Sequence, residues 1–339
     1  MIDSIIIDGL AFALPMFIMA IGGIFSEKSG ITNLAIEGLQ GFGAFTGAFA
    51  MVILTNAMGT GTQVPYYISF LVAAAGGMIY SMVHVILCIR FKANQVISGV
   101  VVNILAMALT SFLTRRLNLM IFGETSKKFI LETSVRYDVP VLSEIPFIGA
   151  AFKRVYPFEI LIVIIAVIAW YVMYRTPYGM HLRACGDNPH AADAAGIDVG
   201  RVQMIAIVLS GGLSAIGGMC YAYSISANFS PDIYLGLGYL AIAALIFGNW
   251  SILPTLGACL LFGFARSIGH EVIKNLGMPS TYNDLVRTLP YVVTLLLLMG
   301  IYSAVFVFLP FMILPPVVCV KIKTAARAAV SVCYSSSRL

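Results

Sequence analysis

The chain has 339 residues, of which 60% are hydrophobic and only 10% charged, and its net charge is +5. Its mean hydropathy is +0.95. A soluble protein carries roughly a quarter charged residues, because its surface must face water. The composition therefore excludes a soluble globule and predicts that most of the outer surface faces lipid.

The first two thirds of the chain contain six apolar runs long enough to cross a membrane, since a spanning helix needs about 20 apolar residues. These runs are 9–25, 34–54, 66–89, 96–113, 158–174 and 202–225. We expect Arg115 and Arg116 to stop the fourth span, because charged side chains mark its end.

Small residues recur at helical spacing inside these runs, in three pairs: Gly43 and Gly47, Ala73 and Gly77, Ser214 and Gly218. In lipid, helices associate through close approach of their backbones, which small side chains permit. We expect these residues to lie where helices pack. They carry no information about a transported solute.

The next stretch predicts a broken helix. Residues 239–247 are apolar but too short to span, residues 248–251 interrupt them, and residues 253–264 continue the apolar pattern. Such a break, or a tight hairpin, is tolerated in a membrane only where it is buried in protein or lines a wet cavity. The later run 291–320 is longer than one span and contains prolines that should end or bend its helix. We therefore expect an all-α, polytopic membrane bundle of about eight to ten transmembrane helices, including a broken or re-entrant pair.

Lysine and arginine in short loops predict the orientation, because they favour the cytoplasmic side. The loop 55–65 has neither and is expected outside, whereas the loop 175–201 carries several and is expected in the cytoplasm. The transmembrane domain is predicted over 1–320, with a cytoplasmic tail over 321–339. The N-terminus then lies outside. The segment 117–156 must lie outside too, despite its lysines and arginines, because long translocated loops follow the charge rule poorly.

The loop between the fifth and sixth spans has the sequence of a short, well-defined helix. Asp187 or Asn188 can cap its start, and Pro189 fits its first position. Gly196 supplies a left-handed stop, and Asp198 can cap the following span. Such a rigid surface helix suits the docking of a cytoplasmic partner. The balanced charges of the loop argue against nucleic acid as that partner.

Residues 25–39, between the first two spans, form the other distinctive stretch. Asn33 can cap the second helix. Glu37 then falls in its first turn, where the helix dipole favours an acid. An ionisable side chain at membrane depth is also a candidate for function. Both roles of Glu37 stay open at this point.

Several polar side chains in or beside the spans could line a solute pathway: Glu37, His84, Asn94, Gln95, Asn103 and Tyr221. The alternative is structural, because a lone His or Asn in a membrane helix usually bonds a neighbouring helix. Aromatic residues near the ends of spans commonly serve as interface anchors.

The sequence offers no catalytic or metal site. Its six cysteines and four histidines are scattered without ligand spacing, whereas structural metal sites need clustered ligands. A membrane enzyme would need a clustered catalytic set, so this class ranks last. An ion-coupled carrier would place charged residues in several spans. Only Glu37 and Arg266 qualify here, which disfavours that class.

Four segments resemble motifs of the permease subunits of bacterial ATP-driven importers, in the branch that serves nucleosides, simple sugars and branched-chain amino acids. They are SEKSGITNLAIEGL from Ser26, ANQVISGVVVNILA from Ala93, LRACGDNPHAADAAGIDVGRVQ from Leu182 and GYLAIAALIFGNWSILPTLGACLLFGFA from Gly238. Their order and spacing are similar to the family over roughly residues 10–300. The first two are closest to nucleoside-type permeases.

The resemblance implies a translocation subunit, not an enzyme, that moves a nucleoside-like solute across the bacterial cytoplasmic (inner) membrane by alternating access. It implies three partners: a second related permease, a cytoplasmic ATP-binding subunit, and an extracytoplasmic binding protein or lipoprotein. The ATP-binding subunit would dock on the coupling residues Gly186, Asp187, Asn188, Pro189, Ala192, Asp193, Ala195 and Gly196. ATP and magnesium would bind to that subunit, since this chain has no GxxxxGK[ST] loop and is expected to bind no cofactor.

Two alternatives remain open. The same class of importer could carry riboflavin, a simple sugar or a branched-chain amino acid, since their polar groups would suit similar side chains. From another class, the chain could be an ion-coupled secondary transporter.

Overall fold

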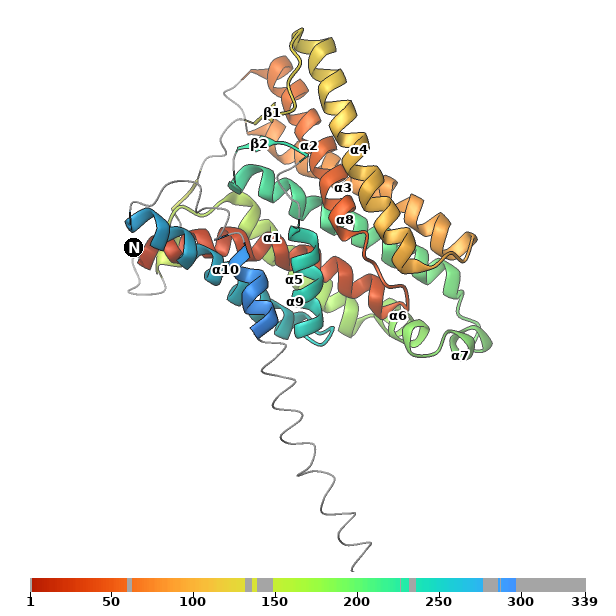
Figure 1. The fold of residues 1–339 in the computed structure, drawn as a ribbon. Coiled ribbons are helices and arrows are strands. Elements are labelled where there is room, and N and C mark those ends of the chain that lie inside the picture. The colour runs from red at the N-terminus through yellow and green to blue at the C-terminus, as the bar shows by residue number, and fades with distance from the viewer. Residues whose placement is uncertain are drawn as a thin grey trace, which may run out of the picture. The chain divides into compact units, whose positions relative to one another are not determined.

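The computed structural model describes residues 2–59, 63–131, 136–138, 149–225, 227–231, 236–276, 286 and 288–296 (Figure 1). The chain divides into two units, Met1–Pro290 and Tyr291–Leu339. Of the second unit only residues 291–296 are described, and they are helical. The rest of the predicted run 291–320 and the predicted tail 321–339 lie outside the described residues, so both stay predictions.

In the described part of the chain, seven helices are long and apolar enough to cross a membrane. They are α1 (Ile2–Lys28), α2 (Ile36–Met58), α3 with the π-helical turn η1 (Val64–Val85 and Ile86–Arg90), α4 (Gln95–Phe122), α5 (Pro157–Arg175), α8 (Val199–Ile225) and α10 (Ile252–Asn275). Each of the six predicted spans corresponds to one of these helices. The predicted all-α, polytopic bundle is confirmed.

The predicted break is a hairpin of two helices. The first, α9 (Leu237–Phe247), has 11 residues and ends at Gly248, and α10 begins four residues later at Ile252. An 11-residue helix is about 16 Å long, which is too short for a hydrocarbon core of roughly 30 Å. Both helices pack against α1 and against each other. The irregular backbone between them thus joins two helices that α1 supports.

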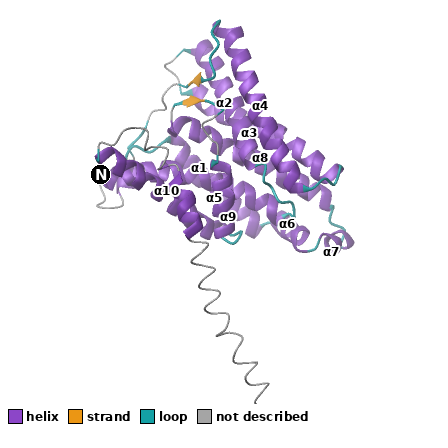
Figure 2. Ribbon diagram, viewed as in Figure 1, coloured by secondary structure: helices purple, strands orange, loops and turns teal. Residues whose placement is uncertain are grey.

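The remaining elements are short: α6 (Pro177–Asp187), α7 (Pro189–Ala194), the 3-10 turn η3 (Gly149–Phe152), and the strands β1 (Phe129–Ile130) and β2 (Asn228–Phe229). The two strands pair antiparallel, with Phe129 opposite Phe229 (Figure 2). This pair joins the segment after α4 to the segment after α8. The C-terminal ends of α4 and α8 therefore lie at the same end of the bundle, as alternating spans require.

The predicted stop of the fourth span at Arg115 and Arg116 is wrong, because α4 continues to Phe122. Arginine is a good helix former, so it ends an apolar run without ending the helix. With 28 residues, α4 is about 42 Å long. It exceeds a typical hydrocarbon core, and its last turns can carry the two arginines beyond the lipid tails.

Close helix contacts surround α8, which packs against α1, α2 and α3. A Cβ at Gly43 of α2 or Gly77 of α3 would overlap the side chain of Ala215 in α8. A Cβ at Gly218 would overlap the backbone of Gln40 in α2. The small residues lie where helices pack, as predicted, and they let the three backbones approach closely.

We expect Gly218→Val to lower the free energy of unfolding by about 1–3 kcal/mol, the usual cost of overpacking. The new side chain would press on the backbone of Gln40, which moves only if α2 moves. The melting temperature of the chain in detergent measures the loss. Gly257→Val is the matched control, because a Cβ at Gly257 meets nothing within 4 Å. An equal loss in both variants would contradict the packing argument.

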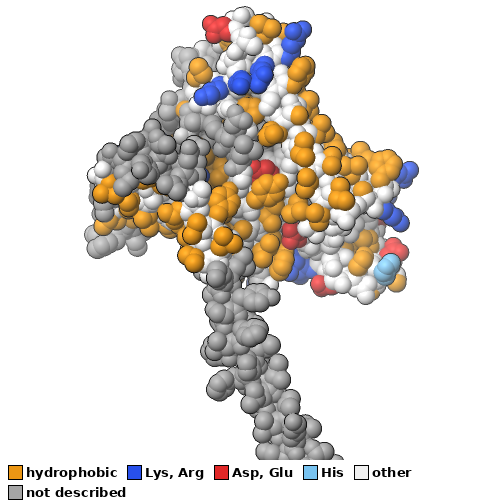
Figure 3. All heavy atoms as spheres, viewed as in Figure 1, with side chains coloured by type: hydrophobic (Ala, Val, Ile, Leu, Met, Phe, Trp, Pro, Cys, Tyr) orange, Lys and Arg blue, Asp and Glu red, His pale blue; other side chains and the backbone are white. Residues whose placement is uncertain are grey.

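Apolar side chains point outward along α4 and α5. Ile104, Phe112 and Val167 are each more than 60% exposed. In Figure 3 hydrophobic side chains cover much of the visible face, and Lys and Arg side chains gather at the top, where α4 and β1 lie. Further charged side chains lie at the lower right, where α6 and α7 are, and an apolar outer face between charged ends is what a membrane-embedded surface requires.

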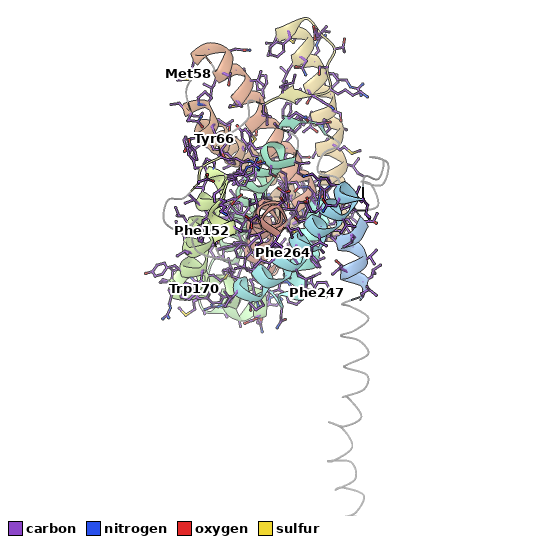
Figure 4. The ribbon with its side chains drawn as sticks, turned by 90° about the vertical axis from the view of Figure 1, so that its left-hand side faces the viewer. Met58, Tyr66, Phe152, Trp170, Phe247 and Phe264 are labelled. Atoms are coloured by element: carbon purple, nitrogen blue, oxygen red, sulfur yellow. The ribbon has the colours of Figure 1, made fainter. Side chains whose placement is uncertain are left out.

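The C-terminal ends of different helices lie at opposite ends of the bundle. Figure 4 shows Trp170, near the C-terminal end of α5, and Phe247, the last residue of α9, toward the bottom of the view. Met58, the last residue of α2, lies toward the top. The turn after α9 is therefore at the end of the bundle where α5 leads into α6 and α7.

Candidate functional site

Helices α6 and α7 form a capped connection between α5 and α8, and α7 lies at the edge of the bundle in Figure 1. The Oδ1 atom of Asn188 accepts a hydrogen bond from the Ala191 N–H at 3.1 Å, and Pro189 occupies the first turn of α7. Gly196 follows with a left-handed φ of 85°. Asp198 Oδ1 accepts from the backbone N–H of Arg201 at 3.0 Å, at the start of α8. The predicted first-turn proline, left-handed glycine and Asp198 cap of this loop are confirmed, and Asn188 is the N-cap of α7.

Most of the predicted coupling residues are on the surface. The exposed ones are Asp187, Asn188, Pro189, Asp193, Ala195 and Gly196. Ala192 is only 4% exposed and fixes α7 to the protein. Gly186 is half-buried. The arrangement presents a polar, rigid surface, and its role in coupling stays a prediction.

We expect Asn188→Ala to loosen α7 by about 1 kcal/mol, the usual value of such a cap. The Ala191 amide, which loses its acceptor, should exchange its hydrogen about fivefold faster, the equivalent of ~1 kcal/mol in local opening. Hydrogen exchange followed by mass spectrometry measures this. Asn188→Asp keeps an oxygen at the same place and should exchange like the unmodified chain. Unchanged exchange in Asn188→Ala would contradict the capping role.

The end of α6 packs directly on the α1–α2 turn, which comprises residues 28–35. A Cβ at Gly186 would overlap the carbonyl oxygen of Lys28, so only glycine allows this approach. On the side of α8, Gln203 Nε2 donates to the carbonyl of Ser29 at 3.1 Å. Cys185 is fully buried beside Gly186, and burial raises the pKa of its thiol, which keeps it neutral. The two stretches that stand out in the sequence are therefore neighbours in the fold.

Buried hydrogen bonds make this turn rigid. Ser26 Oγ donates to the carbonyl of Ile31 at 2.9 Å, and Ser29 Oγ donates to the carbonyl of Ser26 at 2.6 Å. Asn33 Nδ2 donates to Ser210 Oγ of α8 at 2.9 Å. Ser26, Ser29 and Asn33 are completely buried. Buried polar groups with all these bonds made hold one defined conformation.

The predicted capping of α2 by Asn33 is wrong. The helix begins at Ile36, and its N-cap residue, Ala35, has no side-chain cap. Asn33 Oδ1 instead accepts from the Ala35 N–H at 3.0 Å, a local turn contact, while its amide group reaches α8. The asparagine thus fixes the turn that precedes α2 rather than the helix itself.

Glu37 binds the start of a different helix. Its Oε1 atom accepts from the Gly236 N–H at 2.6 Å, and its Oε2 atom accepts from the Gly238 N–H at 2.6 Å and the Tyr239 N–H at 3.3 Å. These donors lie at the N-terminus of α9, where the first backbone N–H groups have no partner inside the helix. A carboxylate satisfies them and complements the dipole of α9. Without it, these groups would be unpaired inside a membrane protein.

A cavity of about 180 Å³ adjoins this contact, between α2, α4 and the start of α9. Its polar lining residues are Glu37, Asn103, Thr110 and Tyr239. The structure thus brings together two of the predicted pathway residues, Glu37 and Asn103. Tyr239, which is 44% exposed, is a member that the sequence analysis did not single out. Its position at the start of the broken segment is the signal that could have identified it.

Both the oxygen and the nitrogen of the Asn103 side-chain amide make hydrogen bonds that hold the residues lining this cavity in place. Its Oδ1 atom accepts from the Gly38 N–H at 2.7 Å. Its Nδ2 atom donates to the carbonyl of Leu34 at 2.8 Å and to the hydroxyl of Tyr239 at 3.0 Å. These bonds join α4 to α2 and orient the ring of Tyr239. The side chain of Tyr239, held in this way, lines the cavity where it can meet a solute.

The four other predicted pathway residues lie outside the described lining of this cavity. Each makes a capping or packing contact: His84 Nδ1 lies 2.9 Å from Ser98 Oγ, Asn94 caps α4, Gln95 Oε1 accepts from the Thr32 N–H at 2.8 Å, and Tyr221 donates to the carbonyl of Phe12 at 2.9 Å. These contacts give each of the four a structural role. A part in solute transport stays a prediction.

The sequence model of the family described as "Branched-chain amino acid transport system / permease component" matches residues 5–301. The chain belongs to this permease family. The permease is thus the translocation subunit of an ABC importer and a multi-pass membrane protein, and the predicted family is confirmed. Membership in this family also argues against the alternative that the chain is an ion-coupled secondary transporter.

Relatives cover most of the permease. It is 36% identical over 302 residues to the guanosine ABC transporter permease protein NupQ of Bacillus subtilis, which covers 88% of this chain and 92% of the relative. It is 35% identical to the nucleoside ABC transporter permease protein NupC of Lactococcus lactis, with the same coverage. The putative glucose ABC transporter permease protein TsgC13 of Haloferax volcanii is 28% identical over 82% of each chain. No solved structure matches the permease.

Proposed function

We propose that this permease carries nucleosides into the bacterial cytoplasm across the inner membrane. The observation that carries the proposal is the similarity, at 35–36% identity over 92% of their length, to relatives named for guanosine and for nucleosides. The cavity chemistry supports it. The carboxylate oxygens of Glu37 already accept hydrogen bonds from three backbone N–H groups, and the aromatic side chain of Tyr239 lines the cavity. Such a lining suits a neutral, flat solute.

A second related permease would complete the pathway. The cavity measures about 180 Å³, whereas sites for small molecules usually measure roughly 300–1,000 Å³. This chain would therefore supply one half of a site, and the apolar outer face of α4 next to it would meet the partner. Each of the two organisms has a second permease named for the same solute, NupP in Bacillus subtilis and NupB in Lactococcus lactis, at 25% and 21% identity to this chain.

The energy would come from a separate ATP-binding subunit that docks on α7 and binds ATP and magnesium. An extracytoplasmic binding protein or lipoprotein would deliver the solute to the opposite end of the bundle. ATP would close the nucleotide-binding subunits, and these would displace α6 and α7, so that the bundle opens to one side at a time. ATP can shift this equilibrium only if the subunits bind the two conformations with different affinity.

Uptake of labelled guanosine into proteoliposomes that hold the whole complex tests the solute. We expect uptake that requires ATP and is reduced by unlabelled nucleosides. A sugar is the second candidate, because a permease named for glucose is 28% identical to this chain. ATP-driven uptake of glucose or riboflavin without guanosine uptake would overturn the nucleoside assignment and keep the importer. Uptake that ignores ATP and follows an ion gradient would overturn the whole proposal.

Co-purification of the ATP-binding subunit with Asp193→Lys tests the docking surface. A charge reversal on the exposed face of α7 should weaken docking about tenfold or more, because like charges at an interface cost several kcal/mol. Glu124→Lys changes the charge by the same amount at an exposed site after α4, at the other end of the bundle. It should leave co-purification unchanged. Equal loss in both variants would argue against α7 as the docking site.

A further inference from the structure

Two carboxylates on either side of the α1–α2 turn reach opposite ends of α9. Glu37, after the turn, accepts from the backbone N–H groups of Gly236 and Gly238 at the start of α9, both at 2.6 Å. Glu27, before the turn, accepts from the indole N–H of Trp250, in the turn that follows α9. One short segment of the chain therefore holds α9 at both ends.

The contact at the start of α9 is close as well as polar. A Cβ at Gly238 would lie 2.7 Å from the Cα and N atoms of Glu37, so glycine is required for the approach of the two backbones. Because these are backbone atoms of α2, the start of α9 cannot keep its place if the start of α2 moves. Packed helices transmit such displacements because close-packed interiors deform little.

The segment between the two carboxylates is rigid and touches α6. Its carbonyl groups at Lys28 and Ser29 meet Gly186 of α6 and Gln203 of α8. The side chains of Ser29 and Asn33 are fully buried and hydrogen-bonded. A displacement of the end of α6 therefore moves the turn as one body instead of being absorbed within it.

The turn after α9 contains two consecutive residues other than glycine in the left-handed conformation. Asn249 and Trp250 have left-handed φ angles of 48° and 52°, a conformation that asparagine tolerates but that is unfavourable for the bulky side chain of tryptophan. Strain of this kind persists only where the surroundings hold it. The bond between Trp250 and Glu27 is a contact that holds it. If Glu27 moves, the backbone of this turn can relax and α9 can shift.

We propose that the α1–α2 turn is the lever through which movement of α6 and α7 reaches α9, with Glu27 and Glu37 as its two attachment points. Helix α9 carries Tyr239, whose side chain lines the cavity, so a shift of α9 moves a side chain that faces the solute. Glu27 and Glu37 are positioning residues in this mechanism, because they contact α9 and act through it. The inference rests on the proposed docking of the ATP-binding subunit on α7.

The test compares ATP hydrolysis with solute uptake in proteoliposomes that hold the whole complex. The double variant weakens both attachment points. Glu37→Gln places an NH2 group, which cannot accept a hydrogen bond, against one of the backbone N–H donors of α9. Trp250→Phe keeps an aromatic ring but removes the indole N–H that Glu27 accepts from. We expect ATP hydrolysis to persist, while the ATP consumed per guanosine transported rises about fivefold or more, the lower end of usual couplings between two sites. Glu271→Gln, in a carboxylate of α10 that lies 3.9 Å from Lys274 Nζ, is the control and should leave the ratio unchanged.

A second measurement follows α9 itself. Ile246 of α9 is 47% exposed, so a cysteine introduced by Ile246→Cys should react with a maleimide at a rate that changes when α9 moves. Labelling of the chain without this substitution gives the background rate of the native cysteines. We expect the rate to change about threefold or more when vanadate traps the ATP-binding subunit, within the usual range of coupling. The double variant should lose this change, and Glu271→Gln should keep it.

The outcomes separate the two proposals. If the unmodified complex shows no ATP-driven uptake, the proposed function fails and the lever fails with it. If the unmodified complex couples and the double variant couples equally well, or its α9 label still responds to vanadate, only the lever is overturned. If the double variant does not fold, Trp250→Phe alone must raise the ratio about twofold, part of the same coupling. No rise in that variant would also overturn the lever.

Discussion

Valine in place of Gly186 is expected to reduce ATP-driven uptake about tenfold or more while the bundle stays folded. Its Cβ would overlap the carbonyl oxygen of Lys28, so the end of α6 must move away from the α1–α2 turn. Overpacking of this kind costs about 1–3 kcal/mol, and ~1.4 kcal/mol corresponds to a factor of ten. The initial rate of uptake into proteoliposomes measures the effect, and co-purification shows that the ATP-binding subunit still docks.

The matched control for this variant is Gly200→Val. Gly200 lies in the first turn of α8, near the same loop, and a Cβ there would meet no atom closer than 3.6 Å. We expect the control to retain most of the uptake. If Gly186→Val transports as fast as Gly200→Val, the contact between α6 and the turn has no part in coupling. If both lose docking, the loop itself is disturbed and the packing argument is wrong.

The spans could be predicted from the sequence because lipid imposes a simple rule on each segment separately. An apolar run of sufficient length is expected to cross the membrane as a helix, and each of the six runs forms a helix long and apolar enough to do so. Helix ends follow a different rule. Backbone hydrogen bonding continues wherever side chains allow it, so α4 passes Arg115 and Arg116 and ends at Gly123, which has the left-handed conformation of a C-cap.

The caps of the coupling loop were predictable for a related reason. Asn188, Pro189 and Gly196 act on backbone groups within a few residues, so their order along the chain determines their geometry. The function of that loop depends on a partner chain, which no local rule describes.

The partner of Glu37 could not be predicted in this way. The sequence correctly suggested an acid at the N-terminus of a helix, but the helix it binds most directly is α9, 199 residues further along the chain. The same holds for Asn103, whose partners Leu34 and Tyr239 are 69 and 136 residues away. Contacts at such separations depend on how the spans pack, and hydropathy does not determine packing. The cavity residue Tyr239 was missed for this reason.

The contacts of Glu37 explain how the bundle accommodates a carboxylate beside a helix end. A carboxylate at membrane depth is costly unless other groups satisfy it. Glu37 meets three backbone N–H groups that would otherwise be unpaired, so each side offsets part of the cost of the other. A short helix that begins inside the membrane needs such a partner, and a carboxylate on a neighbouring helix supplies it without adding a second charge.

Alanine in place of Glu37 is therefore expected to cause a large loss of stability, about 3 kcal/mol or more in the free energy of unfolding. It removes the acceptors of the N–H groups of Gly236, Gly238 and Tyr239, and a buried donor left without a partner costs about 1–3 kcal/mol. The melting temperature of the chain in detergent measures the loss. Hydrogen exchange at the start of α9 should increase in parallel, because these amides lose their protection.

Two comparisons locate the cause of that loss. Glu37→Gln keeps one acceptor oxygen and should cost roughly half as much, because one of the two short bonds can still form. Glu271→Ala removes a buried carboxylate whose ion-pair contact, to the largely exposed Lys274, is long at 3.9 Å, and it should therefore cost less than Glu37→Ala. If Glu37→Ala were no more harmful than Glu271→Ala, the start of α9 would have another support. Glu37 would then have to be assigned to the solute pathway instead of to the architecture that surrounds it.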